Sequence, residues 1–357
     1  MQSTRNSYER GATRYRIIRT ISTAGDRLFS HQGLKWLCRL CLLEYVQIYY
    51  VRIPSMYVRI DTTGRSFIYC FPLPAMNFVV FTCTYYPSTS DLRYVQFLET
   101  LQAAKKYAVR IVVVDGSPDG VHKALKEGYD GRNGAVIVRQ TYQGGKGAAL
   151  REAADVAAAG GRGAFEAGAE TLLCWQEAEK TNQLSHWRKV MVALAAATDD
   201  GADVVVPRRT QQCFMDSYPI EQYHSETYGN LYLDTVMKDA IRGSDNDDMQ
   251  LPIANTSTPR GISLIDWHFG PFAFRAKHIK LWSTYKGNSY DAQLVPIVHA
   301  IRRGLRVVSV DVDFVLDGRM REQEENNVDF IEKRLNQLND LDPKVKASWT
   351  DDLYSIE

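Results

Sequence analysis

Short apolar, β-branched runs alternate with helical patterns from about residue 77 onward, and this alternation restricts the fold more than any other feature. The alternation is typical of βαβ units that build a parallel sheet. The sequence therefore predicts a single α/β, Rossmann-like domain with a mostly parallel central sheet flanked by helices. Strands are predicted at Phe78–Thr84, Arg110–Asp115, Ala135–Val138, Thr171–Trp175, Asp203–Val206, Phe272–Arg275 and Arg306–Val312.

Apolar residues at helical spacing fill most of the segments between these strands. The first helix is expected to begin after Asp91, whose side chain suits an N-cap. The polar stretch Arg242–Arg260 is predicted to be a loop. Further helices are predicted at Ala148–Ala159, Trp187–Ala197, Ile220–Ile241, Asp291–Arg302 and Phe330–Leu338.

Residues 1–77 differ from the rest in composition, with eleven Lys and Arg against four Asp and Glu. We expect a basic, poorly ordered extension there, then the main domain at 78–317 and a C-terminal helical tail at 318–357. Because the start is rich in Arg and Ser and poor in acids, a targeting segment is the alternative to a cytoplasmic location. The six scattered cysteines favour a reducing compartment.

The whole chain has a formal net charge of +1, so its bulk charge indicates no nucleic-acid partner. No apolar run approaches the roughly 18 residues of a membrane span, so no transmembrane segment is expected. The function must therefore be sought in local motifs, and three of them lie at the ends of predicted strands.

The first motif is Asp115 with the turn 116–120 that follows it. A carboxylate at the end of a parallel strand lies at the crevice where open α/β sheets bind ligands. Asp115 could there accept hydrogen bonds from a base or ribose, and Gly116 would let a ligand approach the backbone. An ordinary Asp-Gly turn explains the same residues.

The second motif is the run Gly144–Gly147, in which Lys146 precedes a helix. Free amides at a helix N-terminus, together with a lysine, favour a phosphate. The spacing does not fit a Walker loop, and Ala148 stands where Ser or Thr is required.

The third motif is Glu177-Ala-Glu179, directly after a predicted strand. Two carboxylates that flank one residue can face a single divalent cation, and hard oxygen ligands suit Mg²⁺ or Mn²⁺. A solvated, acidic helix start is the alternative interpretation.

The order of these motifs resembles glycosyltransferases of the A fold, especially family 2, with their strand-Asp turn, Gly-Lys-Gly loop and Asp-x-Asp metal motif. The stretch Glu177–Trp187 is also similar to mannosylglycerate-synthase-type enzymes, in which a tryptophan follows the second acid. The resemblance covers roughly Phe78–Asp317. It implies the glycosyltransferase A fold, a nucleotide-sugar donor and a Mn²⁺ or Mg²⁺ cofactor.

The resemblance also implies roles for individual residues on the donor side. Asp115 would bind the base or ribose, and Glu179 would be the principal metal ligand with Glu177 beside it. Family members usually carry Asp at both metal positions, and the longer Glu displaces the cation unless the backbone retreats. Residues implied to approach the nucleotide or its phosphates are Thr82, Thr84, Gly145, Lys146 and Gly147.

On the acceptor side, Asp266 and His268 lie where the family places its acceptor loop. Asp291 resembles the usual catalytic base of inverting members, although a helix N-cap explains it equally well. A structural histidine is the alternative for His268. Arg208 follows a predicted strand and could pair with phosphate or an anionic acceptor, or could lie in a solvated basic turn.

These residues together predict a glycosyltransferase that moves a sugar from a nucleotide-diphosphate sugar to an unidentified hydroxyl acceptor, inverting or retaining. One alternative is a non-catalytic nucleotide-sugar-binding protein on the same fold, favoured by the Glu-x-Glu replacement. A nucleotidyltransferase is another, but its Gly-rich loop normally follows the first strand, whereas here the loop follows the third.

Overall fold

The computed structural model divides the chain into two compact units, residues 1–74 and 75–357. The structure describes residues 51–53, 56–60, 66–69, 77–132, 134–163, 167–196, 202–242, 253–254, 265–325 and 328–350. Most of the predicted basic extension and of the predicted loop Arg242–Arg260 therefore lies outside the described residues.

The described part of the first unit is a small antiparallel sheet in the order β1-β2-β3. Its strands are β1 (Val51–Ile53), β2 (Met56–Ile60) and β3 (Ser66–Tyr69). Val58 of β2 pairs with Val51 on one side and Ile68 on the other. These three strands were not predicted from the sequence.

The second unit is built on a sheet whose eight described strands have the order β6-β5-β4-β7-β10-β8-β11-β9. Within the described residues β10 is antiparallel to both of its neighbours, and the other pairings are parallel. The predicted α/β fold with a mostly parallel sheet is therefore confirmed. The strands are β4 (Phe78–Thr84), β5 (Arg110–Asp115), β6 (Ala135–Arg139), β7 (Leu172–Trp175), β8 (Val204–Arg209), β9 (Ile253–Ala254), β10 (Phe272–Arg275) and β11 (Val307–Val312).

The central strands are apolar because both faces of the sheet are covered by helices. Successive side chains of a strand point to opposite faces, so Ile111 and Val113 of β5 enter one core cluster while Val112 and Val114 enter the other. Complete burial of one such side chain stabilises the fold by about 1.5–3 kcal/mol. This two-sided burial explains why these strands can be recognised from the sequence.

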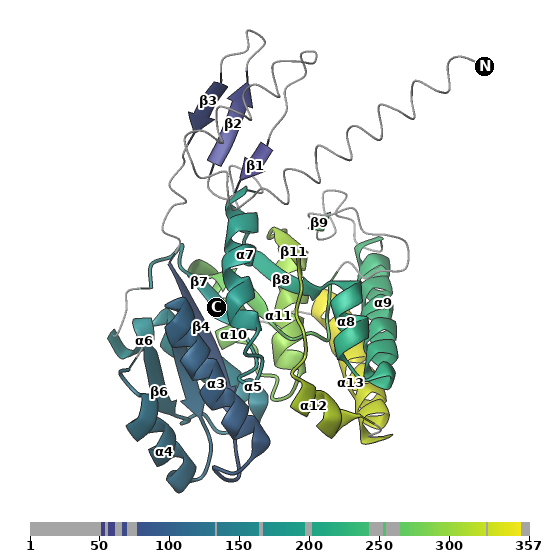
Figure 1. Cartoon of the computed structure of the whole chain (residues 1–357). Coiled ribbons are helices and arrows are strands. Elements are labelled where there is room, and N and C mark those ends of the chain that lie inside the picture. The colour runs from purple at the N-terminus through teal and green to yellow at the C-terminus, as the bar shows by residue number, and fades with distance from the viewer. Residues whose placement is uncertain are drawn as a thin grey trace, which may run out of the picture. The chain divides into compact units, whose positions relative to one another are not determined.

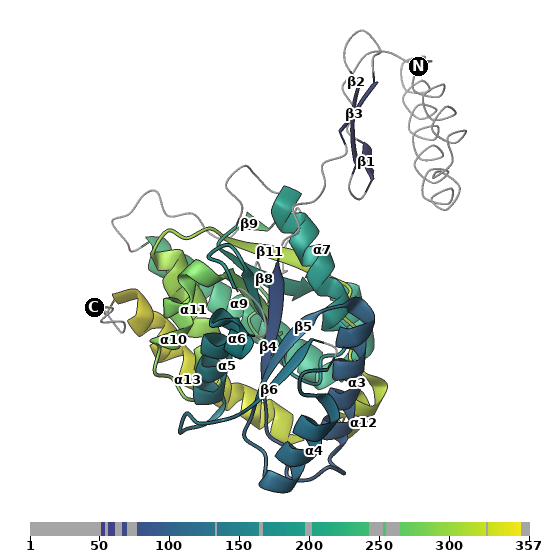
Figure 2. The same cartoon turned by 90° about the vertical axis from the view of Figure 1, so that its left-hand side faces the viewer.

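Helices form a layer on each side of the sheet (Figures 1 and 2). Helices α3 (Leu92–Tyr107), α4 (Asp119–Tyr129) and α7 (Gln183–Ala196) contribute to the first cluster, for example through Phe97, Leu125 and Trp187. Helices α5 (Lys146–Ala158), α10 (Lys280–Ser283) and α11 (Asp291–Arg302) cover the opposite face, where Leu150 and Trp282 are buried. The remaining helices are α6 (Gly160–Gly163), α8 (Gln211–Ser217), α9 (Ile220–Arg242), α12 (Gly318–Glu324) and α13 (Val328–Thr350).

The last helix is longer than predicted, and it contributes to the core. Helix α13 runs through Pro343 to Thr350, whereas the pattern predicted Phe330–Leu338. Leu338, Leu341 and Val345 belong to the core cluster that includes α9 and α11, so its apolar face is buried on the domain. No helix in the described part of the chain is long and apolar enough to cross a bilayer.

Candidate functional site

A cavity of about 1250 Å³ opens at the carboxyl ends of the parallel strands. Its wall includes Thr84 at the end of β4, Trp175 at the end of β7 and Arg209 at the end of β8. The first turn of α5 and residues of α12 and α13 also line it. This is the edge at which open α/β sheets bind ligands, and we therefore treat the cavity as the candidate site.

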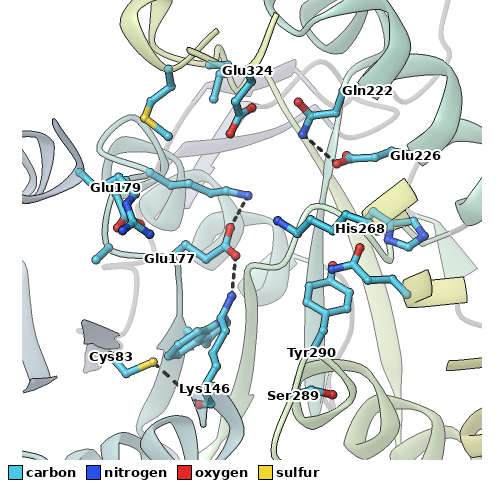
Figure 3. A pocket seen from close by; sticks show the side chains of 18 of the residues that line it. Cys83, Lys146, Glu177, Glu179, Gln222, Glu226, His268, Ser289, Tyr290 and Glu324 are labelled. Carbon is cyan, nitrogen blue, oxygen red and sulfur yellow. Dashed lines mark hydrogen bonds and ion pairs between the residues drawn. The ribbon is translucent and has the colours of Figure 1, made fainter. Parts of the chain in front are cut away.

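Three charged side chains form the centre of this cavity. Glu177, which follows β7, accepts one ion pair from Lys146 and another from Lys180, each with 2.7 Å between nitrogen and oxygen. Figure 3 shows both ammonium groups directed at the single carboxylate. Burial would raise the pKa of Glu177, but the two lysines outweigh burial and hold this pKa far below its ordinary value. The two lysines therefore favour the anionic form of Glu177, and in that form the trio carries one net positive charge.

Local structure fixes these three side chains. Lys146 is the first residue of α5. A turn after β7, closed by a hydrogen bond of 3.0 Å from the Lys180 amide to the Glu177 carbonyl, brings Lys180 back over Glu177. The Lys180 ammonium also donates to the Phe269 carbonyl and lies 4.6 Å from the centre of the Phe269 ring. Such contacts restrict its rotamers.

Glu179 lines the same cavity but belongs to a different group of side chains. In Figure 3 its carboxyl lies away from the Glu177 pair. Burial raises the pKa of Glu179 above its ordinary value, the charge of Glu177 adds to the rise, and Lys146 and Arg93 oppose it. Glu179 also raises the pKa of Tyr86, whose own burial is the larger cause. Lys146 thus acts on both acids of the motif, through an ion pair with Glu177 and through its charge on Glu179.

The side chains present do not fit a divalent cation shared by Glu177 and Glu179. Both oxygens of Glu177 already face ammonium groups. Two like unit charges 4 Å apart repel by about 4 kcal/mol at an effective dielectric constant near 20. A divalent cation could therefore bind Glu177 only if both lysine side chains moved away from it. Among the described residues, no group of three or more His, Cys, Asp or Glu side chains is placed to hold a metal ion.

The glycine run Gly144–Gly147, at the start of α5, contributes to packing as well as to the cavity wall. A Cβ on Gly147 would lie 2.3 Å from the Gly287 carbonyl oxygen, and one on Gly145 would lie 2.8 Å from the Asn288 carbonyl oxygen. The Gly147 amide donates to that Asn288 oxygen at 3.1 Å. Arg151 holds the same loop through the Tyr285 carbonyl at 2.9 Å. The amide of Gly147 is therefore used within the protein.

Arg209 forms a buried ionic network at the opposite wall. It donates to Asp266 and to Glu226 at 2.7 Å each, and its side chain is 1% exposed. Burial opposes its charge, but Asp266 and Glu226 outweigh burial and hold the pKa of Arg209 well above its ordinary value. The guanidinium also stacks 3.6 Å from the centre of the Phe214 ring. Gln222 extends the network by donating to Glu226 at 2.9 Å.

His268 and Tyr290 form an aromatic surface in the cavity. Their rings are nearly parallel, at 7° and 6.1 Å between centroids, and both line the cavity. The Tyr290 hydroxyl donates to the Trp267 carbonyl at 2.8 Å. A Cβ on Gly229 of α9 would lie 2.3 Å from His268 Nε2, so only glycine lets the imidazole approach the helix so closely.

Glu324, at the end of α12, points into the cavity above the Glu177 group in the view of Figure 3. Burial is the main cause that raises its pKa to about 7, with the charge of Glu226 second. Lys180 and Lys333 oppose the rise, whereas Glu177 adds to it. Glu324 therefore exchanges its proton near neutral pH.

The structure brings some of the predicted site residues to one cavity and places others elsewhere. The predicted residues that line it are Thr84, Gly145, Lys146, Glu177, Glu179 and His268. The predicted residues outside its lining are Thr82, Asp115, Gly116, Gly147, Arg208, Asp266 and Asp291.

Asp115 is completely buried, and its carboxylate contacts three neighbouring side chains. It accepts hydrogen bonds from the Thr84 hydroxyl at 2.8 Å and the Ser117 hydroxyl at 2.5 Å, and it pairs with His122 at 2.8 Å. These contacts connect β4, the turn after β5, and α4. Beside it, a Cβ on Gly116 would meet the end of the Gln140 side chain at 2.4 Å, and Thr82 is buried in β4.

Asp291 and the other predicted acceptor-side charges also have internal partners. Asp291 is 1% exposed and accepts from the Tyr285 hydroxyl at 2.6 Å and the Ser289 hydroxyl at 2.5 Å. The N-cap of α11 is Tyr290 and Asp291 is the first helical residue, so the N-cap interpretation of Asp291 is wrong. Its carboxylate instead binds Tyr285 and Ser289, which precede the helix. Arg208 pairs with Asp311 across neighbouring strands at 2.6 Å.

Several cavity residues were not assigned a role from the sequence. Lys180, Glu324 and Tyr290 lie on turns or at helix ends that only the folded chain brings together. A lysine three residues after an acid, as in Glu177 and Lys180, was the one available signal, but such spacing is common on solvated helices.

The sequence matches no known protein-family profile, and no curated protein matches it. Solved structures are similar in fold. Glucosyl-3-phosphoglycerate synthase from Mycobacterium tuberculosis, in complex with Mn²⁺, UDP and phosphoglyceric acid, is 12% identical over 79% of this chain and 80% of its own, with a TM-score of 0.44. Its complex with UDP, Mn²⁺ and glucosyl-3-phosphoglycerate covers 77% and 78% at 12% identity, with a TM-score of 0.42.

A mycobacterial protein is 13% identical over 77% of this chain and 74% of its own, with a TM-score of 0.41. All three similarities have identities of 12–13% and TM-scores below 0.5. At such identities and TM-scores they assign no activity to this chain.

Proposed function

We propose that the chain is a glycosyltransferase that binds a nucleotide-diphosphate sugar in this cavity and transfers the sugar to a hydroxyl acceptor. The observation that carries the proposal is the gathering of Lys146, Lys180 and Glu177 at the carboxyl edge of a parallel sheet. Ammonium groups in a partly enclosed cavity favour a diphosphate and stabilise it as it leaves.

The cavity volume of about 1250 Å³ is ample for a donor and an acceptor, since ligand pockets typically measure about 300–1000 Å³. Thr84 and the glycines before α5 would lie beside the donor. His268, Tyr290 and Gln222 would face the acceptor, because aromatic faces and amide groups suit sugar rings and hydroxyls.

Transfer breaks the bond between the sugar and the diphosphate, forms a bond from the acceptor oxygen to the sugar, and releases one proton from the acceptor. A base is most effective when its pKa lies near the working pH. Glu324 has a pKa of about 7 and points into the cavity, whereas Asp291 is enclosed. We therefore assign proton removal to Glu324.

The test is release of a nucleoside diphosphate from a panel of UDP-, GDP-, ADP- and dTDP-sugars, with mixed sugar and hydroxy-acid acceptors. We expect one donor to be consumed faster in the presence of an acceptor, and Lys146→Met to reduce this turnover by about 10²-fold or more. A wild-type chain that binds a donor but never turns it over supports a non-catalytic binding protein, which the enclosure of Asp291 would also fit.

A further inference from the structure

We propose that Lys146 and Lys180 hold the donor's diphosphate in place of a divalent cation, and that Glu177 is their internal counter-ion until the diphosphate arrives. This proposal rests on the function proposed above. A divalent cation normally links an acidic motif to phosphate oxygens. Here Glu177, the first acid of that motif, already forms ion pairs with two lysines of the same chain.

The geometry of the trio carries the proposal. Each ammonium group lies 2.7 Å from a different oxygen of Glu177. Within the trio two ammonium charges face one carboxylate, and the charges of Glu179 and Glu324 also act on Lys146 and Lys180. The trio lies at the cavity edge where the phosphates of a nucleotide ligand are expected. A diphosphate offers more acceptor oxygens and more charge than one carboxylate, so it can replace Glu177 as their partner.

The two lysines differ in how firmly they are held. The Lys146 side chain is 38% exposed and the Lys180 side chain is 14% exposed. Lys180 is fixed by the Phe269 carbonyl and lies near the Phe269 and Phe314 rings, so it provides a preorganised charge. Lys146 begins α5 beside the cavity glycines and has room to turn toward a ligand.

The experiment titrates inorganic pyrophosphate into the full chain by calorimetry in buffer that contains EDTA. Pyrophosphate represents the diphosphate without a base or sugar. We expect wild type to bind it, and Lys146→Met and Lys180→Met each to weaken binding about tenfold or more. Lys180→Arg, which keeps the charge, should bind more tightly than Lys180→Met. Lys189→Met, at an exposed lysine of α7 that pairs with Asp313, should change the affinity less than about twofold.

Glu177→Gln separates this proposal from cation binding, because the two accounts predict opposite signs. Removal of the internal counter-ion should tighten pyrophosphate binding in EDTA. If Glu177 instead ligated Mn²⁺, the same change would weaken binding in the presence of Mn²⁺. Thermal unfolding of each variant checks that the chain still folds.

The outcomes distinguish this proposal from the proposed function. Pyrophosphate binding that appears only with Mn²⁺, or that Glu177→Gln weakens, overturns the lysine proposal while nucleotide-sugar turnover can still be observed. Binding in EDTA that depends on both lysines supports the lysine site. A failure of every nucleotide-sugar to bind would then overturn the glycosyl-transfer function and the assignment of the diphosphate to a donor, but not the site itself.

Discussion

Glu324 is the residue whose chemistry is most directly accessible to a pH experiment. Its carboxyl is charged above a pKa of about 7, so a base at this position makes the transfer rate rise as pH increases from 6 to 8. Glu324→Gln should lower kcat about 10²-fold or more and flatten this profile. Glu322→Gln, at an exposed position of the same helix, is the matched control. An unchanged profile in Glu324→Gln would remove the assignment.

Stability gives a second readout for Glu324. Because the folded pKa is raised above that of an exposed glutamate, the folded state binds the extra proton, and the stability associated with it is lost as pH rises through about 7. Glu324→Gln should therefore raise the midpoint of thermal unfolding relative to wild type at pH 8 and change it less at pH 5. A larger gain at pH 5 would mean that the carboxyl is not in a pKa-raising environment.

Arg209 is the residue on which the opposite cavity wall depends. Arg209→Met leaves Asp266 and Glu226 buried without their cation, and breaking a buried pair in this way costs about 3–5 kcal/mol. Urea unfolding measures the loss. Lys189→Met removes an exposed pair with Asp313 and should cost less than about 1 kcal/mol. Equal effects of the two changes would show that the buried network contributes little.

At the scale of elements, two glycines at equivalent helix positions provide a matched comparison. Gly147 is the second residue of α5, and Gly120 is the second residue of α4. A Cβ on Gly147 would collide with the backbone of Gly287 and Asn288, whereas nothing lies within 4 Å of a Cβ on Gly120. Gly147→Ala should destabilise the fold by about 1–3 kcal/mol, and Gly120→Ala should leave it unchanged or up to about 1 kcal/mol more stable.

Thermal and urea unfolding of both variants test this comparison. A Gly147→Ala protein as stable as wild type would show that the loop containing Gly287 and Asn288 moves at little cost. The glycine would then be needed for ligand binding more than for the packing of α5. Pyrophosphate titration of the same variant then reports whether displacement of the loop reaches the cavity.

The elements that could be predicted from the sequence are those whose pattern is dictated by two-sided burial. Strand β5 and helix α11 were predicted with the bounds that the structure has. The short helices α8, α10 and α12 were not, because four to seven residues contain too few turns for a periodic signal. Helix α13 continues through Pro343, where a proline normally predicts an end.

The candidate site was predictable only in part, because local sequence does not distinguish a cap from a catalytic acid. Lys146, Glu177 and Glu179 reach one cavity, as their places after predicted strands implied. Asp291 lies at the start of a helix whether it is structural or catalytic. Its burial depends on Tyr285 and on Lys344 of α13, whose ammonium nitrogen lies 3.4 Å from the Asp291 carboxylate. Long-range partners of this kind have no signature near the residue itself.

At the scale of the whole molecule, residues 75–357 form a compact unit that contains the cavity and all the side chains proposed to act in it. We therefore expect removal of residues 1–74 to leave nucleotide-sugar affinity within about twofold of the full chain. Calorimetric titration of both proteins measures this. If the truncated protein did not fold, this expectation would be wrong, and residues 1–74 would be required for the folding of residues 75–357.

Thermal unfolding of the full chain with UDP-, GDP-, ADP- and dTDP-sugars measures whether the cavity binds a nucleotide-diphosphate sugar. A ligand at about 100 times its Kd stabilises the fold by about 2.7 kcal/mol, which shifts Tm by several degrees. We expect such a shift with at least one donor, and its loss in Lys146→Met. No shift with any donor, at concentrations up to several millimolar, would contradict this expectation.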